Sequence, residues 1–190
     1  MPTNYFRQLL IVSLAILTSG CASSYITNSD YQFDSTNPNE GMVVLSTRIL
    51  DKCATQQDPL GVSFLKYEGL INGEMVNGFF LLNNQFIKPD FHHPIGYLWI
   101  KQLEAGQYHL YDVLHSYKYP PSYDSPISVH FTIHPHKITY LGEIYVDAES
   151  CGKRIQLYFH NQGQRDGKIF NARMKNLNAS LFDYQIPVNH

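Results

Sequence analysis

The sequence predicts a mainly β fold, an antiparallel β-sandwich of about eight strands with one short C-terminal helix. Three observations support this fold class. From Gly41 onward, short runs rich in Val, Ile, Phe, Tyr and Leu alternate with clusters of Gly, Pro, Asn and Asp. Residues 128–134 alternate strictly between polar and apolar side chains, and a single helical stripe of apolar residues occurs near the C-terminus.

The expected strands are the β-branched and aromatic runs that turn residues separate. In chain order they are Met42–Arg48, Gly61–Tyr67, Gly78–Leu82, Gly96–Gln102, Gln107–Ser116, Ser128–Ile133, Ile138–Val146 and Arg154–His160.

The patterns within these strands predict which faces are buried. Val129, Phe131 and Ile133 fall on one face of their strand, so the opposite, polar face is solvated. Phe79–Leu82 and Tyr97–Ile100 are apolar on both faces, which predicts central strands or strands covered by the C-terminal segment. Trp99 is therefore expected in the core. Gly142 inside a strand indicates a bulge or a close backbone contact.

The C-terminal segment predicts one helix followed by an edge strand. Phe170, Met174 and Leu177 recur at i, i+4 and i+7, a stripe that can dock on the sandwich, and Asp166 is the expected N-cap. Residues 181–186 alternate in polarity, which predicts an edge strand that Pro187 ends.

The first twenty residues have the order of an export signal. Arg7 is the only charged side chain among them, and the nine-residue, largely apolar run Leu9–Leu17 follows it. As a helix this run spans about 13 Å, whereas a hydrocarbon core is about 30 Å thick, so it does not predict a transmembrane anchor.

The small residues 18–20 ahead of Cys21 resemble the lipobox of bacterial lipoproteins, in which the cysteine thiol receives a diacylglyceryl group and becomes the new N-terminus. The resemblance implies acyl chains on Cys21, and two or more chains suffice for stable anchoring. Ala22 resembles the sorting pattern for the outer membrane. The alternative is an ordinary secretory signal that is cut nearby.

The chain therefore divides into a signal peptide (residues 1–20), a lipidated cysteine with a flexible tether (21–40), and a single β-sandwich domain (41–190). Residues 22–40 are rich in Ser, Asn, Asp and Thr without an apolar period, which is typical of a solvated tether. Such a coil spans roughly 25 Å root-mean-square. The remainder of the chain is long enough for one core of ordinary size.

Three cysteines are present, and lipidation of Cys21 leaves Cys53 and Cys151 as a pair. In the oxidising periplasm the two can form a disulfide, which the chain-entropy model credits with about 4.7 kcal/mol. Two buried free thiols are the alternative.

Two segments resemble a known kind of domain. Residues 103–113, LEAGQYHLYDV, resemble the L-x-x-G-x-Y-x-L segment of small β-sandwich domains related to the transthyretin-like, carboxypeptidase regulatory-like fold. Residues 131–144, FTIHPHKITYLGEI, resemble an F-x-I-x-P-G-K-x-x-Y-L-G-x-I run of uncharacterised bacterial lipoproteins, with His136 in place of its Gly. The resemblance implies a β-sandwich lipoprotein, and it implies no reaction or cofactor.

Charge and motifs exclude several functions. The net charge is −2, and −3 once Arg7 is removed with the signal, so no basic field exists to hold nucleic acid. The chain contains no GxSxG, HExxH, phosphate loop or GxGxxG before a helix, so the sequence predicts no enzyme.

Two groups of residues are candidates for binding. Tyr117, Tyr119 and Tyr123 surround a proline-stiffened turn and form a candidate partner-binding loop, although the same rings can simply pack over an end of the sandwich. His134 and His136 straddle Pro135 and can converge on a transition metal, whereas scattered surface histidines are the alternative interpretation.

The sequence thus predicts a non-catalytic outer-membrane lipoprotein without a cofactor. Its lipid holds it to the membrane, and its domain lies in the periplasm, with the cell surface as an alternative, where it contacts an envelope protein or a cell-wall component. The alternative function is that of a periplasmic metal-binding lipoprotein centred on His134 and His136.

Overall fold

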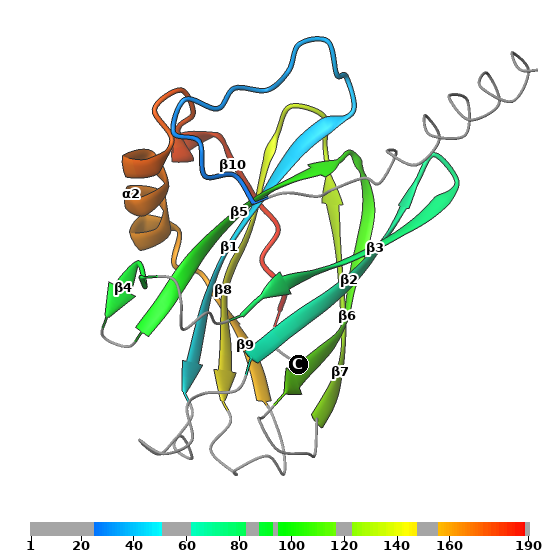
Figure 1. Cartoon of the computed structure of the whole chain (residues 1–190), viewed down its shortest axis with the longest axis vertical. Coiled ribbons are helices and arrows are strands. Elements are labelled where there is room, and N and C mark those ends of the chain that lie inside the picture. Colours follow the sequence, from blue (N-terminus) through cyan, green and yellow to red (C-terminus); the bar gives the residue numbers. More distant parts are fainter. Residues whose placement is uncertain are drawn as a thin grey trace, which may run out of the picture.

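The structure is a computed structural model that describes residues 25–50, 62–82, 88–92, 95–116, 123–147 and 156–188. Within these ranges, the side chains of residues 49–50, 62–63, 115–116 and 123–126 are not described. Two β-sheets pack face to face, and a short helix lies beside one of them (Figure 1). The predicted mainly β class, with two sheets and a short C-terminal helix, is confirmed.

One sheet has six strands and the other has four. The six-stranded sheet has the order β10 (Phe182–Tyr184), β8 (Ile138–Asp147), β1 (Glu40–Leu50), β5 (Ile95–Glu104) and β4 (Phe91–His92), and β9 (Gln156–His160) also pairs with β8. The four-stranded sheet has the order β3 (Glu74–Leu81), β2 (Val62–Ile71), β6 (Gly106–Ser116) and β7 (Tyr123–Ile133).

Each of the eight strands expected from the sequence overlaps an observed strand, and the expected C-terminal edge strand is β10. The pairing is not purely antiparallel, because β1 and β10 both run parallel to β8. β7 and β8 belong to different sheets, and the tight turn at residues 134–137 carries the chain from one sheet to the other. Local periodicity reports which face of a strand is buried, but it does not report the partner.

The two segments that are apolar on both faces have different environments. Tyr97–Ile100 lies in β5, between β1 and β4, and is buried on both faces as expected. β3 is instead the edge of the four-stranded sheet, and the Phe79 side chain is 49% exposed. The expectation of a central or covered strand is therefore wrong for β3.

The core between the sheets consists of side chains that alternate along the strands. Its largest members come from both sheets and include Leu45, Leu65, Tyr67, Phe80, Trp99, Tyr108, Leu110, Phe131, Ile133 and Ile144. Trp99 is buried as expected, and its indole Nε1 donates to Thr47 Oγ1 at 2.9 Å. The Thr47 hydroxyl in turn donates to the Leu82 carbonyl at 2.7 Å, so the polar groups of Trp99 and Thr47 are both paired.

The outer face of the six-stranded sheet is covered by α2 (Gly163–Arg173), the short 3₁₀ helix η1 (Ala179–Leu181) and the segment that precedes β1. Phe170 and Met174 are buried there against Met42 and Leu98. The expected helical stripe is wrong beyond Phe170, because α2 ends at Arg173, so Met174 is its extended C-cap and Leu177 follows the helix. Asp166 is not the N-cap, since α2 follows Gln162, which makes no capping bond through its side chain.

The segment that we expected to be a flexible tether is packed on the domain from Tyr25 onward. The Ile26 amide donates to the Ile100 carbonyl at 2.8 Å, and Tyr25 pairs with Lys101 as an isolated bridge. Tyr31 and Phe33 pack against the cluster beneath α2. The tether expectation is therefore wrong for residues 25–39, because these apolar side chains, although not periodic, find apolar partners on the sheet.

Gly142 marks a bulge in β8, as the sequence predicts. The β1–β8 register shifts between Val44 and Ser46, and Gly142 has a φ of +86°. A Cβ atom there would lie 2.7 Å from the His160 carbonyl oxygen, so a side chain would meet both backbone strain and a clash.

Candidate functional site

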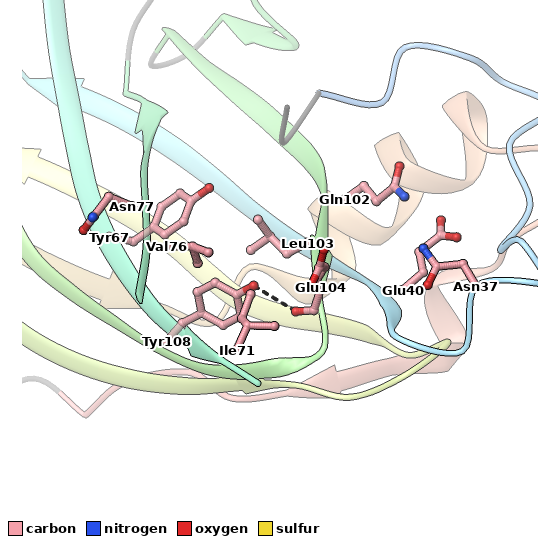
Figure 2. A pocket seen from close by; sticks show the side chains of 10 residues that line it. All are labelled: Asn37, Glu40, Tyr67, Ile71, Val76, Asn77, Gln102, Leu103, Glu104 and Tyr108. Atoms are coloured by element: carbon pink, nitrogen blue, oxygen red, sulfur yellow. Dashed lines mark hydrogen bonds between the residues drawn. The ribbon is translucent and has the colours of Figure 1, made fainter. Parts of the chain in front are cut away.

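A pocket opens at one end of the sandwich, between the end of β5 and the β2–β3 hairpin (Figure 2). Its volume is about 180 Å³. The apolar lining comes mainly from the four-stranded sheet, and the polar lining mainly from the six-stranded sheet and the segment before it. The lining residues are Asn37, Glu40, Tyr67, Ile71, Val76, Asn77, Gln102, Leu103, Glu104 and Tyr108.

Two buried tyrosines form the apolar wall of the pocket. The rings of Tyr67 and Tyr108 meet edge to face with their centroids 5.8 Å apart. The Tyr108 hydroxyl donates to the Glu104 carbonyl at 2.8 Å, which ties the ring of a four-stranded-sheet residue to the end of β5 (Figure 2). The wall is therefore held by contacts between the two sheets.

Two carboxylates stand on the polar side. Glu40 and Glu104 are cross-strand partners in the β1–β5 pair, so their side chains lie on the same face of the sheet. Glu40 is almost fully buried, and its Oε2 accepts a bond from the Asp34 amide at 3.1 Å. Like charges directly opposite each other on a sheet are unfavourable. Both residues belong to the polar lining of the pocket.

The size of the pocket limits what it can accept. At about 30 Å³ for each water molecule, its volume corresponds to roughly six waters. Pockets for drug-sized ligands occupy about 300–1,000 Å³. The pocket therefore fits one group of side-chain size, and its carboxylate and amide lining suits an amine or a hydroxyl better than an anion.

A buried lysine lies on the other side of Tyr67. Lys101 is 4% exposed, and its Nζ donates to the Phe79 carbonyl at 3.0 Å. The ammonium lies over the rings of Tyr67, Tyr25 and Phe80, at 4.9, 5.3 and 5.3 Å from their centroids. Burial lowers the pKa of Lys101 from its usual 10.5 to about 8, because desolvation penalises the charged form.

Tyr25 completes this environment. Its hydroxyl accepts a bond from the Leu81 amide at 2.8 Å, and its ring packs 5.1 Å from Trp99. Burial raises the pKa of Tyr25 to about 12. Tyr25 and Lys101 together join β5 to β3 across the side where the two sheets would otherwise be open.

A second polar cluster lies under α2. Asp166 Oδ2 accepts bonds from the hydroxyls of Ser46 and Tyr140, both at 2.6 Å. Arg165 bridges Asp166 to Glu143, with its Nη1 2.7 Å from Glu143 Oε2. Both carboxylates are fully buried. Burial and the neighbouring Asp166 carboxylate raise the pKa of Tyr140 far above its usual value. The cluster fastens α2 to β1 and β8.

The predicted metal residues flank the turn between β7 and β8. His134 is exposed, whereas His136 Nε2 bonds the Asn37 carbonyl at 3.0 Å and its ring packs 5.7 Å from Phe33. His136 adopts a φ of +53° at the position where the resembled run has Gly. Among the residues that the structure describes, no three His, Cys, Asp or Glu side chains are grouped so that they could hold a metal ion.

Several predicted site residues lie outside the described residues. These are Cys21, Cys53, Cys151, Tyr117 and Tyr119. Tyr123 begins β7, but its side chain is not described. The lipidation, the disulfide and the tyrosine loop therefore stay predictions.

Sequence reasoning missed the pocket and the buried lysine. The alternation of β5 did indicate a buried Lys101, because Lys101 lies on the same, inward face of the strand as Tyr97, Trp99 and Leu103. The sequence contains no local pattern that indicates the pocket, because its two walls come from strands that only the tertiary fold brings together.

No helix in the described ranges combines the length and the apolar character needed to cross a bilayer. No family model and no curated protein matches the chain. Among solved structures, a leucine-rich repeat protein from Bacteroides thetaiotaomicron is similar over 58% of this chain, with 10% identity and a TM-score of 0.32. The match spans 14% of that protein's chain, and a similarity at this level carries no conclusion about function.

Proposed function

We propose that the protein is a lipid-anchored, non-catalytic cell-envelope protein whose β-sandwich is a binding module. The proposed lipid anchor is supported by the position of Tyr25. This first described residue contacts both sheets. Only four peptide steps separate it from Cys21. Tyr25, which contacts both sheets, is thus close in sequence to the residue that the lipobox resemblance marks for acylation.

The anchoring is tested by the mass of the mature protein expressed in a Gram-negative bacterium. We expect a chain that starts at Cys21, carries acyl chains and fractionates with the outer membrane. Cys21→Ala should release the protein from the membrane fraction, whereas the neighbouring control Ser23→Ala should leave it there. A wild-type protein with an unacylated N-terminus would contradict the proposal.

The binding function is supported by the pocket, whose lining includes the cross-strand pair Glu40 and Glu104. We infer that it accepts a protonated amine or a hydroxyl-bearing group of side-chain size from an envelope protein or a cell-wall component. A ligand present at ten times its Kd stabilises a protein by about 1.4 kcal/mol, which a melting experiment detects.

The probe for this inference is ethanolammonium, compared with sodium acetate at equal ionic strength. We expect ethanolammonium to raise the melting temperature of the wild type, and acetate not to raise it. Glu104→Gln should remove the difference between the two probes, and the control Asp147→Asn, at the end of the β1–β8 pair that is remote from Glu40, should retain it. Equal responses to both probes in the wild type would count against an amine site.

A further inference from the structure

The outer face of the β2–β3 hairpin carries a group of exposed apolar side chains, which we call the hairpin patch: Leu70, Met75 and Phe79. Their exposed fractions are 51%, 58% and 49%. Leu70 and Met75 are cross-strand partners, and Met75 and Phe79 are four residues apart in one strand, so all three lie on one face. The Phe64 ring packs edge to face on Phe79 at 5.1 Å and extends the apolar surface along β2.

The apolar composition of the hairpin patch is unusual for a face of a sheet that is exposed to water. Single exposed apolar side chains are normal, whereas a group on one face marks a contact site. Alternation also predicts that a solvated face of a sheet is polar, as it is on β7, where Ser128, His130 and Thr132 point outward. On β3 the outward positions 75 and 79 are apolar, and the exposed Asn77 lies between them.

The beginning of the described chain is fixed beside this patch. The Tyr25 hydroxyl bonds the amide of Leu81, two residues beyond Phe79 in the same strand. The Lys101 ammonium lies 5.3 Å from the Tyr25 ring and 5.9 Å from the Phe79 ring, so the two rings flank one buried group. Tyr25 is therefore held beside β3 in the folded domain.

The length of the preceding chain then limits where the membrane can lie. Four residues reach at most about 14 Å when fully extended. If Cys21 carries the lipid, the bilayer surface lies within this reach of Tyr25 and thus beside β3. A flexible tether over residues 22–40 would have allowed any face of the domain to turn toward the membrane, but the docked segment does not.

We propose that the hairpin patch rests on the phospholipid surface to which Cys21 anchors the protein, with Phe79 and Met75 in contact with the lipid. This inference rests on the proposed lipid anchor. The covered, opposite side of the sandwich, which carries α2 and η1, then faces away from the bilayer (Figure 1).

Tryptophan fluorescence tests this orientation, because Trp99 is the only tryptophan in the chain and is buried. The full-length acylated protein is reconstituted into vesicles of phosphatidylethanolamine and phosphatidylglycerol that contain a brominated phospholipid, which quenches nearby indoles. Phe79→Trp is compared with Leu181→Trp, a matched control that replaces a 59% exposed residue of η1. Met75→Trp reports on the patch independently if Phe79→Trp does not fold.

We expect the bromine to quench the added tryptophan at position 79 or 75 at least twofold more than the one at position 181, with the Trp99 signal unchanged. Equal quenching at the patch and at position 181, or stronger quenching at 181, would overturn the inference. So would a patch tryptophan that is shielded from water but not quenched, since a second copy or another protein would then cover it. Failure of the lipid anchor is distinguished beforehand, because an unacylated chain does not sediment with the vesicles.

Discussion

The outer faces of the two sheets differ in what covers them. The six-stranded sheet is covered on its outer face by α2, η1 and the segment before β1, and its outward residues Met42, Val44 and Tyr140 are fully buried. No described helix packs on the outer face of the four-stranded sheet, where Lys66 and Asp112 form a partly exposed ion pair. Among the described residues, one face is thus covered by a helix and the other is not.

The difference indicates where stability and function are placed in this fold. A covered face contributes apolar burial and paired charges, so substitutions there act on folding. An uncovered face contributes little to folding, so apolar residues on it have another role. Substitutions matched between the two faces should separate these contributions.

The largest difference is expected for phenylalanine. Phe170 is fully buried under α2, 5.1 Å from the Phe182 ring, so Phe170→Ala should lower the free energy of unfolding by about 4 kcal/mol. Phe79→Ala, on the uncovered face, should cost less than about 1 kcal/mol. Urea titration of the mature domain, followed by circular dichroism, measures both. Similar losses would mean that the hairpin patch is part of the core.

The second comparison uses a carboxylate on each face. Asp166→Asn leaves Arg165 and the buried Ser46 and Tyr140 hydroxyls without their charged partner, and should cost about 3 kcal/mol. Asp112→Asn removes a partly exposed ion pair with Lys66 and should cost about 1 kcal/mol or less. Thermal unfolding of the two variants at pH 7 gives the contrast. A larger loss of stability for Asp112→Asn would contradict the conclusion that the charged groups under α2 contribute more to folding than the ion pair on the uncovered face.

The third comparison uses two glycines with the same φ of +86°. A Cβ atom added to Gly73, in the β2–β3 hairpin, would meet no atom of the described residues within 4 Å, so Gly73→Ala should cost only the backbone strain, about 1 kcal/mol. Gly142→Ala adds the contact with the His160 carbonyl, and its cost should be at least twice as large. The melting temperatures of the two variants measure which substitution costs more. Equal decreases in melting temperature would show that β8 and β9 separate easily.

The last expected effect concerns the seam between the two sheets and depends on pH. The pKa of Lys101 is lowered to about 8 in the folded protein, whereas its usual value is 10.5. Between these two pH values the unfolded chain therefore binds more protons than the folded chain. Stability should therefore rise by about 2 kcal/mol between pH 8 and pH 10. Lys101→Met should remove this rise and be more stable than the wild type at pH 7.

Above about pH 10 the dependence of stability on pH reverses. The raised pKa of Tyr25 means that the unfolded tyrosine loses its proton first, so stability should fall with further increase in pH. Urea midpoints measured from pH 7 to pH 11 test both limbs of the profile. A flat profile for the wild type between pH 8 and pH 10 would show that the Lys101 ammonium is solvated.

Much of the fold follows from local pattern. The alternation around Phe131 and the helical position of Phe170 each report a buried face that the structure confirms. The parallel pairing of β8 with β1 does not follow, because the sequence encodes the face of a strand and not its neighbour. Asp166 shows a different limit, since a residue typical of a helix cap becomes a buried partner of side chains 26 and 120 residues away in sequence.

The candidate site was less predictable than the fold. Glu40 and Glu104 are neighbours only because β1 and β5 pair in one register, and a shift of one residue would place them on opposite faces. Local composition places Tyr25 in a solvated tether, because its neighbours are polar and lack a period. Its role depends on β3 and β5, which local composition does not report.

The attachment of Tyr25 also sets the order in which the protein can be assembled. Its partner Leu81 lies 56 residues later in the sequence, so the strands must form before the N-terminal segment can close the seam between the sheets. In an exported chain this segment emerges first, and a lipid would hold it at the bilayer while the rest is still being delivered. The final folding step of such a protein would therefore take place at the membrane surface, with the anchored end as the last piece to lock.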